Sequence, residues 1–193
     1  MSSDGGRAAM PSSSQARYAI ATVTAVGKDL ALTLREKLGK EIPIYTTPRL
    51  ADDRVIAIEG RVIEALGQLF QEVDVLICIM AIGAVVRAIA PVLKDKASDP
   101  AVVVMDEKAT NVISLLSGHL GGANQVTRDI AELLGSNPVI TTATDVQNVT
   151  ALDNLAQSVN GWRPELREFI KPFNSYLGSG RTVYFYQEKD WVT

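Results

Sequence analysis

Residues 73–80, Val73-Asp-Val-Leu-Ile-Cys-Ile-Met80, are the stretch that decides the fold. A nearly continuous apolar run of this kind is typical of a central strand in a parallel sheet, because helices cover both of its faces. The apolar pattern extends to Val86, although Gly83 interrupts it and Arg87 ends it. It falls short of the roughly 20 residues that a membrane-spanning helix needs. We therefore interpret it as a buried strand that turns into a helix.

Strand and helix patterns alternate on both sides of this run. We expect strands at residues 18–24, 42–45, 101–105 and 138–141, an extended segment or short strand at 112–116, and helices at 27–38, 61–70, 84–90 and 122–134. Pro43 suggests that the 42–45 strand lies at an edge. The order predicts an α/β fold, a mostly parallel sheet with helices on both faces, which is Rossmann-like but lacks the nucleotide fingerprint GxGxxG. Ligands of such sheets bind beyond the carboxyl ends of the strands.

The composition limits the classes of function and the domain organisation. The 193 residues carry a formal net charge of -3, which offers no broad basic surface for nucleic acid. The single cysteine, Cys78, is expected to be a buried apolar residue, and this fits a reducing cytoplasm. Residues 1–17 have no apolar core of a signal peptide and are expected to be a disordered leader. We expect an α/β domain at 18–161 and a linker or the start of a second domain at 162–193.

The turn before the 122–134 helix is the first candidate site. It contains the only histidine, His119, and a Gly121-Gly122 pair. Glycines allow close approach of the backbone to a ligand, and a helix start offers N–H donors to a carboxylate or an oxyanion. His119 would be a general base, and the binding residues predicted in this turn are Ser117, Gly118, Gly121, Gly122 and Asn124. The alternative is a tight turn that binds nothing.

A second candidate loop follows the decisive strand. Gly83 opens a helix from which Arg87 emerges, and Lys96 lies in the charged loop beyond. Arginine suits bidentate binding of a carboxylate, whereas the structural alternative is an ion pair with Asp95 or Asp99.

Acidic and hydroxyl side chains at other strand ends complete the candidates. Asp106 follows the 101–105 strand, and Asp145 follows Thr141 and Thr142 at the last strand. Either carboxylate could act as a base, and the threonine hydroxyls could bind a ligand; Asp145 could equally cap a helix. One histidine and one cysteine give no zinc-binding pattern, so we expect no metal site and no cofactor held by the protein.

Three long motifs resemble the CbiG family of cobalamin biosynthesis proteins. They are residues 83–106, GAVVRAIAPVLKDKASDPAVVVMD; residues 113–124, ISLLSGHLGGAN; and residues 139–145, VITTATD. The resemblance extends from about Tyr18 to about Gly161. It implies cobalt-precorrin-5A hydrolase activity in anaerobic vitamin B12 synthesis, in which a δ-lactone of the macrocycle is opened and acetaldehyde is released to give cobalt-precorrin-5B. The cobalt would then enter with the substrate.

The resemblance also implies an architecture and partners. The family has an N-terminal domain, a middle region and a C-terminal domain, and this chain is expected to stop inside the middle region. We expect a cobalt-tetrapyrrole substrate, no nucleic-acid or membrane partner, and an incomplete enzyme if the absent domain is needed; a homo-oligomer is left open. The rival functions are a non-catalytic tetrapyrrole-binding module and a nucleotide-binding fold.

Overall fold

The computed structural model describes residues 16–95, 98–119 and 121–142 and a few residues between Phe169 and Arg181. The chain divides into two compact units, Met1–Val139 and Ile140–Thr193. The predicted leader and the predicted boundary at Gly161 lie almost wholly outside the described residues and stay predictions. In the second unit, the described residues Phe169, Pro172, Phe173, Ser175 and Tyr176 are helical.

Strands and helices alternate through most of the first unit. The strands are β1 (Tyr18–Thr22), β2 (Ile44–Thr46), β3 (Ile56–Ala57), β4 (Val75–Ile79), β5 (Ala101–Met105), β6 (Asn111–Leu116) and β7 (Asn137–Val139). The helices are α1 (Ala25–Leu38), α2 (Val62–Glu72), α3 (Ile82–Ile89) and α4 (Ala123–Leu134), with short 3₁₀ turns η1 (Pro48–Leu50) and η2 (Ala90–Val92).

The strands form one sheet in the order β3-β2-β1-β4-β5-β6-β7. Every neighbouring pair is parallel except β5 and β6, which are antiparallel. The predicted mostly parallel sheet is therefore confirmed, including the parallel pairing of β4 with β5. The antiparallel step reverses β6 and β7 relative to the rest of the sheet.

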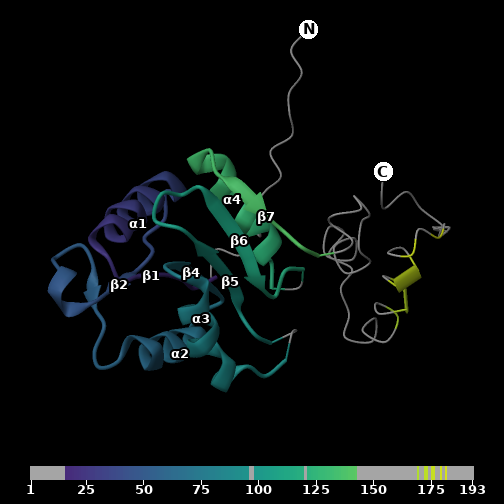
Figure 1. The fold of residues 1–193 in the computed structure, drawn as a ribbon, viewed down its shortest axis with the longest axis horizontal. Helices are drawn as coiled ribbons and strands as arrows, with labels where there is room; N and C mark the ends of the chain where they lie inside the picture. Colours follow the sequence, from purple (N-terminus) through teal and green to yellow (C-terminus); the bar gives the residue numbers. More distant parts are fainter. Residues whose placement is uncertain are drawn as a thin grey trace, which may run out of the picture. The chain divides into compact units, whose positions relative to one another are not determined.

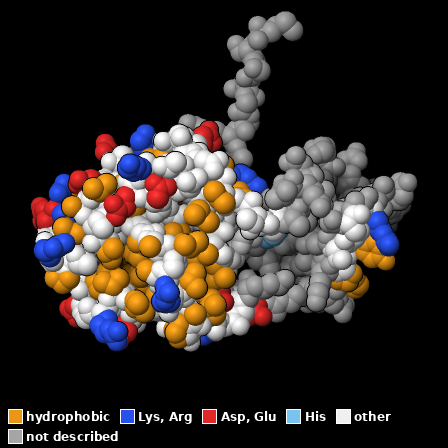
Figure 2. Space-filling model, in the orientation of Figure 1, with side chains coloured by type: hydrophobic (Ala, Val, Ile, Leu, Met, Phe, Trp, Pro, Cys, Tyr) orange, Lys and Arg blue, Asp and Glu red, His pale blue; other side chains and the backbone are white. Residues whose placement is uncertain are grey.

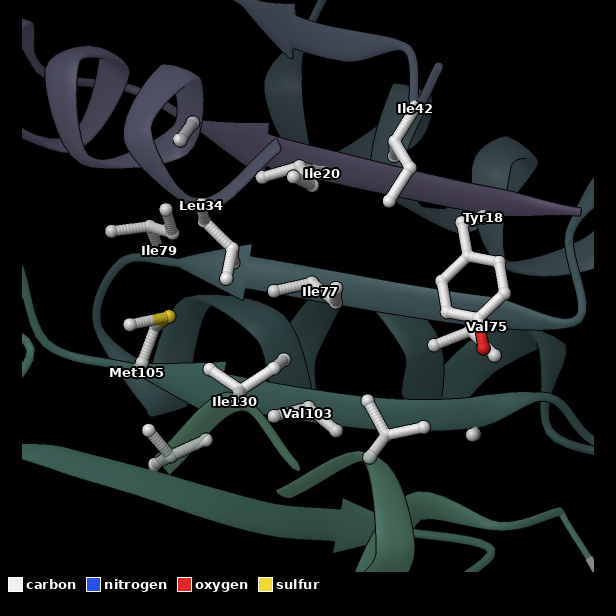
Figure 3. Packing of buried hydrophobic residues seen from close by; sticks show 14 of the residues in the cluster. Tyr18, Ile20, Leu34, Ile42, Val75, Ile77, Ile79, Val103, Met105 and Ile130 are labelled. Atoms are coloured by element: carbon white, nitrogen blue, oxygen red, sulfur yellow. The ribbon is translucent and has the colours of Figure 1, made fainter. Parts of the chain in front are cut away.

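Two hydrophobic layers cover the sheet, one on each face. Figure 1 shows α1 and α4 on one face and α2 and α3 on the other. Alternate residues of β4 serve the two layers, because Ile77 and Ile79 pack towards α1 and α4 whereas Leu76 and Cys78 pack towards α2 and α3. Figure 3 shows the first layer, in which Leu34 of α1 and Ile130 of α4 meet the strand residues. The double covering explains why β4 reads as a continuous apolar run.

Two details of the sheet differ from the sequence prediction. The segment around Pro43 was expected to be an edge strand, but β2 lies between β1 and β3, and Pro43 precedes it. Pro43 therefore removes no N–H from a ladder bond within β2, and the edge argument does not apply. The true edge strand, β3, has only two residues and was missed because so short a strand has no readable period.

Candidate functional site

The reversal at β6 divides the predicted site residues between two opposite edges of the sheet. The carboxyl edge is the one at which β1 to β5 end, and the amino edge is the one at which they begin. Because β6 is antiparallel to β5, it ends at the amino edge, beside the start of β5. The hydroxyl of Ser117, just after β6, accordingly donates to the carbonyl oxygen of Asp99, just before β5, at 2.9 Å. The turn around His119 therefore lies at the amino edge, away from Asp106 and Gly83.

Backbone donors at the start of α4 are bonded within the turn itself. The N–H of Gly122 donates to the carbonyl of His119 at 3.0 Å, and the N–H of Asn124 donates to the carbonyl of Gly118 at 3.0 Å. The N–H of Ala123 donates to the carbonyl of Ser117 at 3.2 Å. The N–H of Gly122, a predicted donor to an oxyanion, is thus already bonded to the protein. Of the predicted Gly121-Gly122 pair, the N–H of Gly121 is the remaining candidate donor.

The glycines of this turn make room for neighbouring protein groups. A Cβ on Gly118 would lie 2.6 Å from Oδ1 of Asn124, and a Cβ on Gly121 would collide with the side chain of Ser117. Oδ1 of the buried Asn124 also accepts a hydrogen bond from the hydroxyl of Ser114 at 2.6 Å. The turn therefore has a structural reason for its glycines, and its role in binding stays a prediction. His119 is half-buried and interacts with other residues of the protein.

A carboxylate and a hydroxyl meet at the carboxyl edge. Thr24 follows β1 and is the N-cap of α1, where its side chain accepts from the N–H of Gly27 at 3.1 Å. The same hydroxyl donates to Oε1 of Glu107, just after β5, at 2.6 Å. Both side chains are half-buried. The bond joins residues that are 83 positions apart in the sequence and fixes the Glu107 side chain across the end of β4.

Asp106, the neighbour of Glu107, is engaged by the turn between β5 and β6. Its carboxylate accepts from the N–H groups of Lys108 at 3.0 Å, Thr110 at 3.2 Å and Asn111 at 2.7 Å. Burial acts to raise the pKa of Asp106, but the hydrogen bonds from Asn111, Thr110 and Lys108 outweigh it, so the pKa lies below its usual value. A carboxylate held in this way is a weak base. The structure therefore favours a structural role for Asp106.

Arg87 and Gly83 lie on the first turns of α3, which begins at the carboxyl edge. The Arg87 guanidinium donates to the carbonyl oxygen of Gly83 at 3.0 Å and is exposed. Among the described residues Arg87 makes no ion pair, so the structural alternative of a bond to Asp95 or Asp99 is not seen there. Asp99 accepts instead from the N–H of Lys94 at 3.1 Å.

The remaining predicted site residues are Lys96, Asp145, Thr141 and Thr142, and their roles stay predictions. Lys96 and Asp145 lie outside the described residues, and Thr141 and Thr142 belong to the second unit. Sequence reasoning missed the contribution of Thr24 and passed over Glu107 in favour of Asp106. The short connection from Met105 to Asn111 was the available signal that β6 runs antiparallel to β5, because a parallel crossover needs a dozen or so residues.

Two features are absent from the part of the chain that the structure describes. No group of three or more His, Cys, Asp or Glu side chains in that part could hold a metal ion. None of its helices combines the length and the apolar character that crossing a membrane requires.

Comparison with known proteins identifies relatives in one family. Residues 64–145 match the family described as Cobalamin synthesis G N-terminal. A cobalt-precorrin-5A hydrolase of Salmonella typhimurium is 44% identical over 154 residues, which cover 79% of this chain and 44% of that protein. A cobalt-precorrin-5A hydrolase of Priestia megaterium is 38% identical over 189 residues, which cover 94% of this chain and 50% of that protein. The chain thus spans about half the length of these curated relatives.

A solved structure is similar to this chain in fold. It is the crystal structure of a cobalamin biosynthesis protein G homolog from Sulfolobus solfataricus, with a TM-score of 0.53 and 25% sequence identity. The match covers 83% of this chain and 46% of that one. The resemblance to the CbiG family is therefore confirmed by sequence and by fold.

Proposed function

We propose that this chain acts as a cobalt-precorrin-5A hydrolase, because residues 64–145 match the family described as Cobalamin synthesis G N-terminal and its relatives carry that name. The reaction opens the δ-lactone of the macrocycle with water and releases acetaldehyde, giving cobalt-precorrin-5B in anaerobic vitamin B12 synthesis. The observation that carries this proposal is the 44% identity to the Salmonella hydrolase over 79% of the chain.

The direct test is incubation of the chain with cobalt-precorrin-5A. We expect acetaldehyde to accumulate in proportion to the protein added, and the mass of the macrocycle product to equal that of the substrate plus one water minus one acetaldehyde. A heat-unfolded sample of the same protein is the matched control. Substrate that is bound but left intact would contradict the proposed activity of this chain alone.

A second candidate is a non-catalytic tetrapyrrole-binding module. The observation that favours it is length, since the chain covers only 44% and 50% of the two curated relatives. Titration of the macrocycle followed by its visible absorbance measures binding without turnover. Saturable binding together with no acetaldehyde would support the module over the enzyme.

The substrate and the partners follow from the same proposal. The cobalt enters as part of the substrate, and the chain needs no cofactor of its own. Arg87 and Lys96 would bind peripheral carboxylates, and a C-terminal domain homologous to the rest of the relatives would complete the enzyme. The expected location is the cytoplasm, where the other soluble intermediates of such a pathway would be found.

The proton-transferring group is a separate part of the proposal. His119 and Asp145 stay predictions, and Asp106 is disfavoured by its hydrogen bonds to the turn. If His119 were the base, His119→Ala would lower turnover by roughly a hundredfold while the melting temperature changed little. If His119 were structural, the variant would chiefly destabilise the fold.

A further inference from the structure

The ends of three parallel strands, β1, β4 and β5, meet at the carboxyl edge, and we name the space beyond these ends the crevice. Thr22 of β1 is in register with Ile79 of β4, which is in register with Met105 of β5. From β1 the chain continues through α1 to β2, whereas from β4 it continues through α3 to β5 on the other side. The connections leave in opposite directions between β1 and β4, and such a switch point is where open α/β sheets bind ligands. The bond between Thr24 and Glu107 crosses this point.

Helix starts flank the crevice from both faces of the sheet. The first N–H groups of a helix have no acceptor within the helix, and they attract negative charge. Ala81, the N-cap of α3, makes no side-chain hydrogen bond to the helix, so its first N–H groups, Ile82 and Gly83, are not capped. Figure 1 places α1 and α3 on opposite faces. A carboxylate or an oxyanion at the crevice would therefore meet N–H donors from α3.

Buried hydroxyls also lie at this edge of the sheet. The side chains of Thr22 and Thr46 are both 0% exposed, and their Oγ1 atoms have no hydrogen-bond partner among the described residues. The Thr22 hydroxyl points at Gly27 in the first turn of α1, where a Cβ would collide with it and would lie 3.1 Å from Oγ1 of Thr24. A buried polar group without a partner costs about 1–3 kcal/mol, and ligand or water commonly satisfies it. The hydroxyls of Thr22 and Thr24 thus converge on Gly27 in the first turn of α1.

Exposed apolar side chains form a rim around it. Val26 near the start of α1 is 56% exposed, Ile82 at the start of α3 is 43% exposed, and Val86 one turn later is 45% exposed. Figure 2 shows hydrophobic side chains gathered over the part of the first unit where Figure 1 places α2 and α3. An apolar rim around polar groups suits a large flat ligand that carries carboxylates.

We propose that this crevice binds the macrocycle and that Glu107 is the catalytic base of lactone opening, with Thr24 as its positioning residue. The inference rests on the proposed function for the reaction. Glu107 takes a proton from water while the water oxygen bonds to the lactone carbonyl carbon. The ring C–O bond then breaks, and Glu107 returns the proton to the departing alkoxide. Lactone and water thus give a hydroxy acid without any further reactant.

The hydrogen bonds of Glu107 suit this role better than those of Asp106. Thr24 holds Oε1 of Glu107, whereas Oε2 has no hydrogen-bond partner among the described residues and can accept the proton. Asp106 uses both carboxylate oxygens for backbone N–H groups of its own turn. A base must be held in place and must also keep a free lone pair, and Glu107 meets both conditions.

The test compares Glu107→Gln with Glu72→Gln in the whole chain. Gln keeps an oxygen that can accept from Thr24 but cannot take up a proton at neutral pH. We expect turnover in Glu107→Gln to fall roughly a hundredfold or more, with macrocycle affinity within about threefold and an unchanged melting temperature. Glu72 is exposed at the end of α2, just before β4 begins at the amino edge and therefore at the opposite edge from Glu107, and its variant should match the unaltered protein. Thr24→Val should shift the acidic limb of the pH–rate profile. Loss of the helix cap alone would not produce this shift. Thr24→Ser keeps a hydroxyl and should restore the profile of the unaltered protein.

Each outcome bears on either the inference or the proposed function. Acetaldehyde release that is retained in Glu107→Gln, or lost only in His119→Ala, overturns the inference and leaves the proposed function intact. If the unaltered chain binds the macrocycle without turnover, the proposed activity fails. The position of the binding site is then tested by comparing the macrocycle affinities of two variants. Loss of binding in Ile82→Glu but not in Leu133→Glu, an exposed site on α4, supports the crevice; equal binding overturns it. If the unaltered chain neither binds the macrocycle nor turns it over, both the inference and the proposed function are contradicted.

Discussion

Replacing Gly27 with alanine should destabilise the protein, although alanine is normally the better helix former. The added Cβ would collide with Oγ1 of Thr22, and it would lie 3.1 Å from Oγ1 of Thr24 and 3.4 Å from Cγ2 of Ile79. Overpacking of this kind costs about 1–3 kcal/mol, and displacing the Thr24 cap costs about 1 kcal/mol more. The better helix propensity of alanine returns about 1 kcal/mol. We expect a net loss of about 2 kcal/mol, equivalent to a fall in melting temperature of about 4–8 °C.

Urea unfolding followed by circular dichroism measures this loss, and a second variant identifies its cause. Thr22→Ala removes the hydroxyl that the new Cβ meets, so Gly27→Ala should cost at least about 1 kcal/mol less in that background. Val26→Ala, at the exposed neighbouring position, should stay within about 0.5 kcal/mol of the unaltered protein. An unchanged urea midpoint for Gly27→Ala, or the same cost in both backgrounds, would refute the close approach of β1 to α1.

Three other predictions concern single side chains. Asp106→Asn should lower the free energy of unfolding at pH 7 by about 1 kcal/mol. Because the pKa of Asp106 is lowered in the folded state, this difference from the unaltered protein should shrink as the pH falls below about 4. A difference that stays constant with pH would contradict the prediction. Burial raises the pKa of Cys78 to about 12, so Ellman's reagent at pH 8 should label the thiol only in denaturant, and labelling of the native protein would disprove the burial. Arg87→Lys should weaken macrocycle binding about tenfold in absorbance titrations, because the bidentate fork is lost, and unchanged affinity would make Arg87 structural.

Most of the fold could be predicted from the sequence because the strongly patterned elements are also the buried ones. β4 could be recognised from its continuous apolar run, because burial on both faces of the sheet requires apolar residues throughout. α4 could be recognised from its 3.6-residue period, because only one face of the helix is buried. β3 could not be found, because two exposed residues carry no pattern. The edge position given to the segment at Pro43 was wrong, because the proline precedes the strand and does not interrupt it.

The candidate site was harder to predict because it depends on strand direction. The rule that ligands bind beyond strand ends treats all ends alike, but β6 points the other way, and so the His119 turn falls at the opposite edge from Gly83 and Asp106. The bond from Thr24 to Glu107 spans 83 residues and follows from the order of the strands in the sheet, which a local pattern does not contain. Strand periodicity thus identified the elements but not which of their ends meet.

The two outer strands of the sheet also bear on how the protein avoids aggregation. The sequences of β4 and β5, VLICI and AVVVM, have the apolar and β-branched composition that readily stacks into amyloid when exposed. In the fold they are central, and the strands outside them make poor templates for a neighbouring chain: β3 is two residues long, and β7 carries Pro138, which has no N–H to donate. A change that lengthened β3 or replaced Pro138 would therefore remove a safeguard against intermolecular strand pairing while leaving the core unaltered.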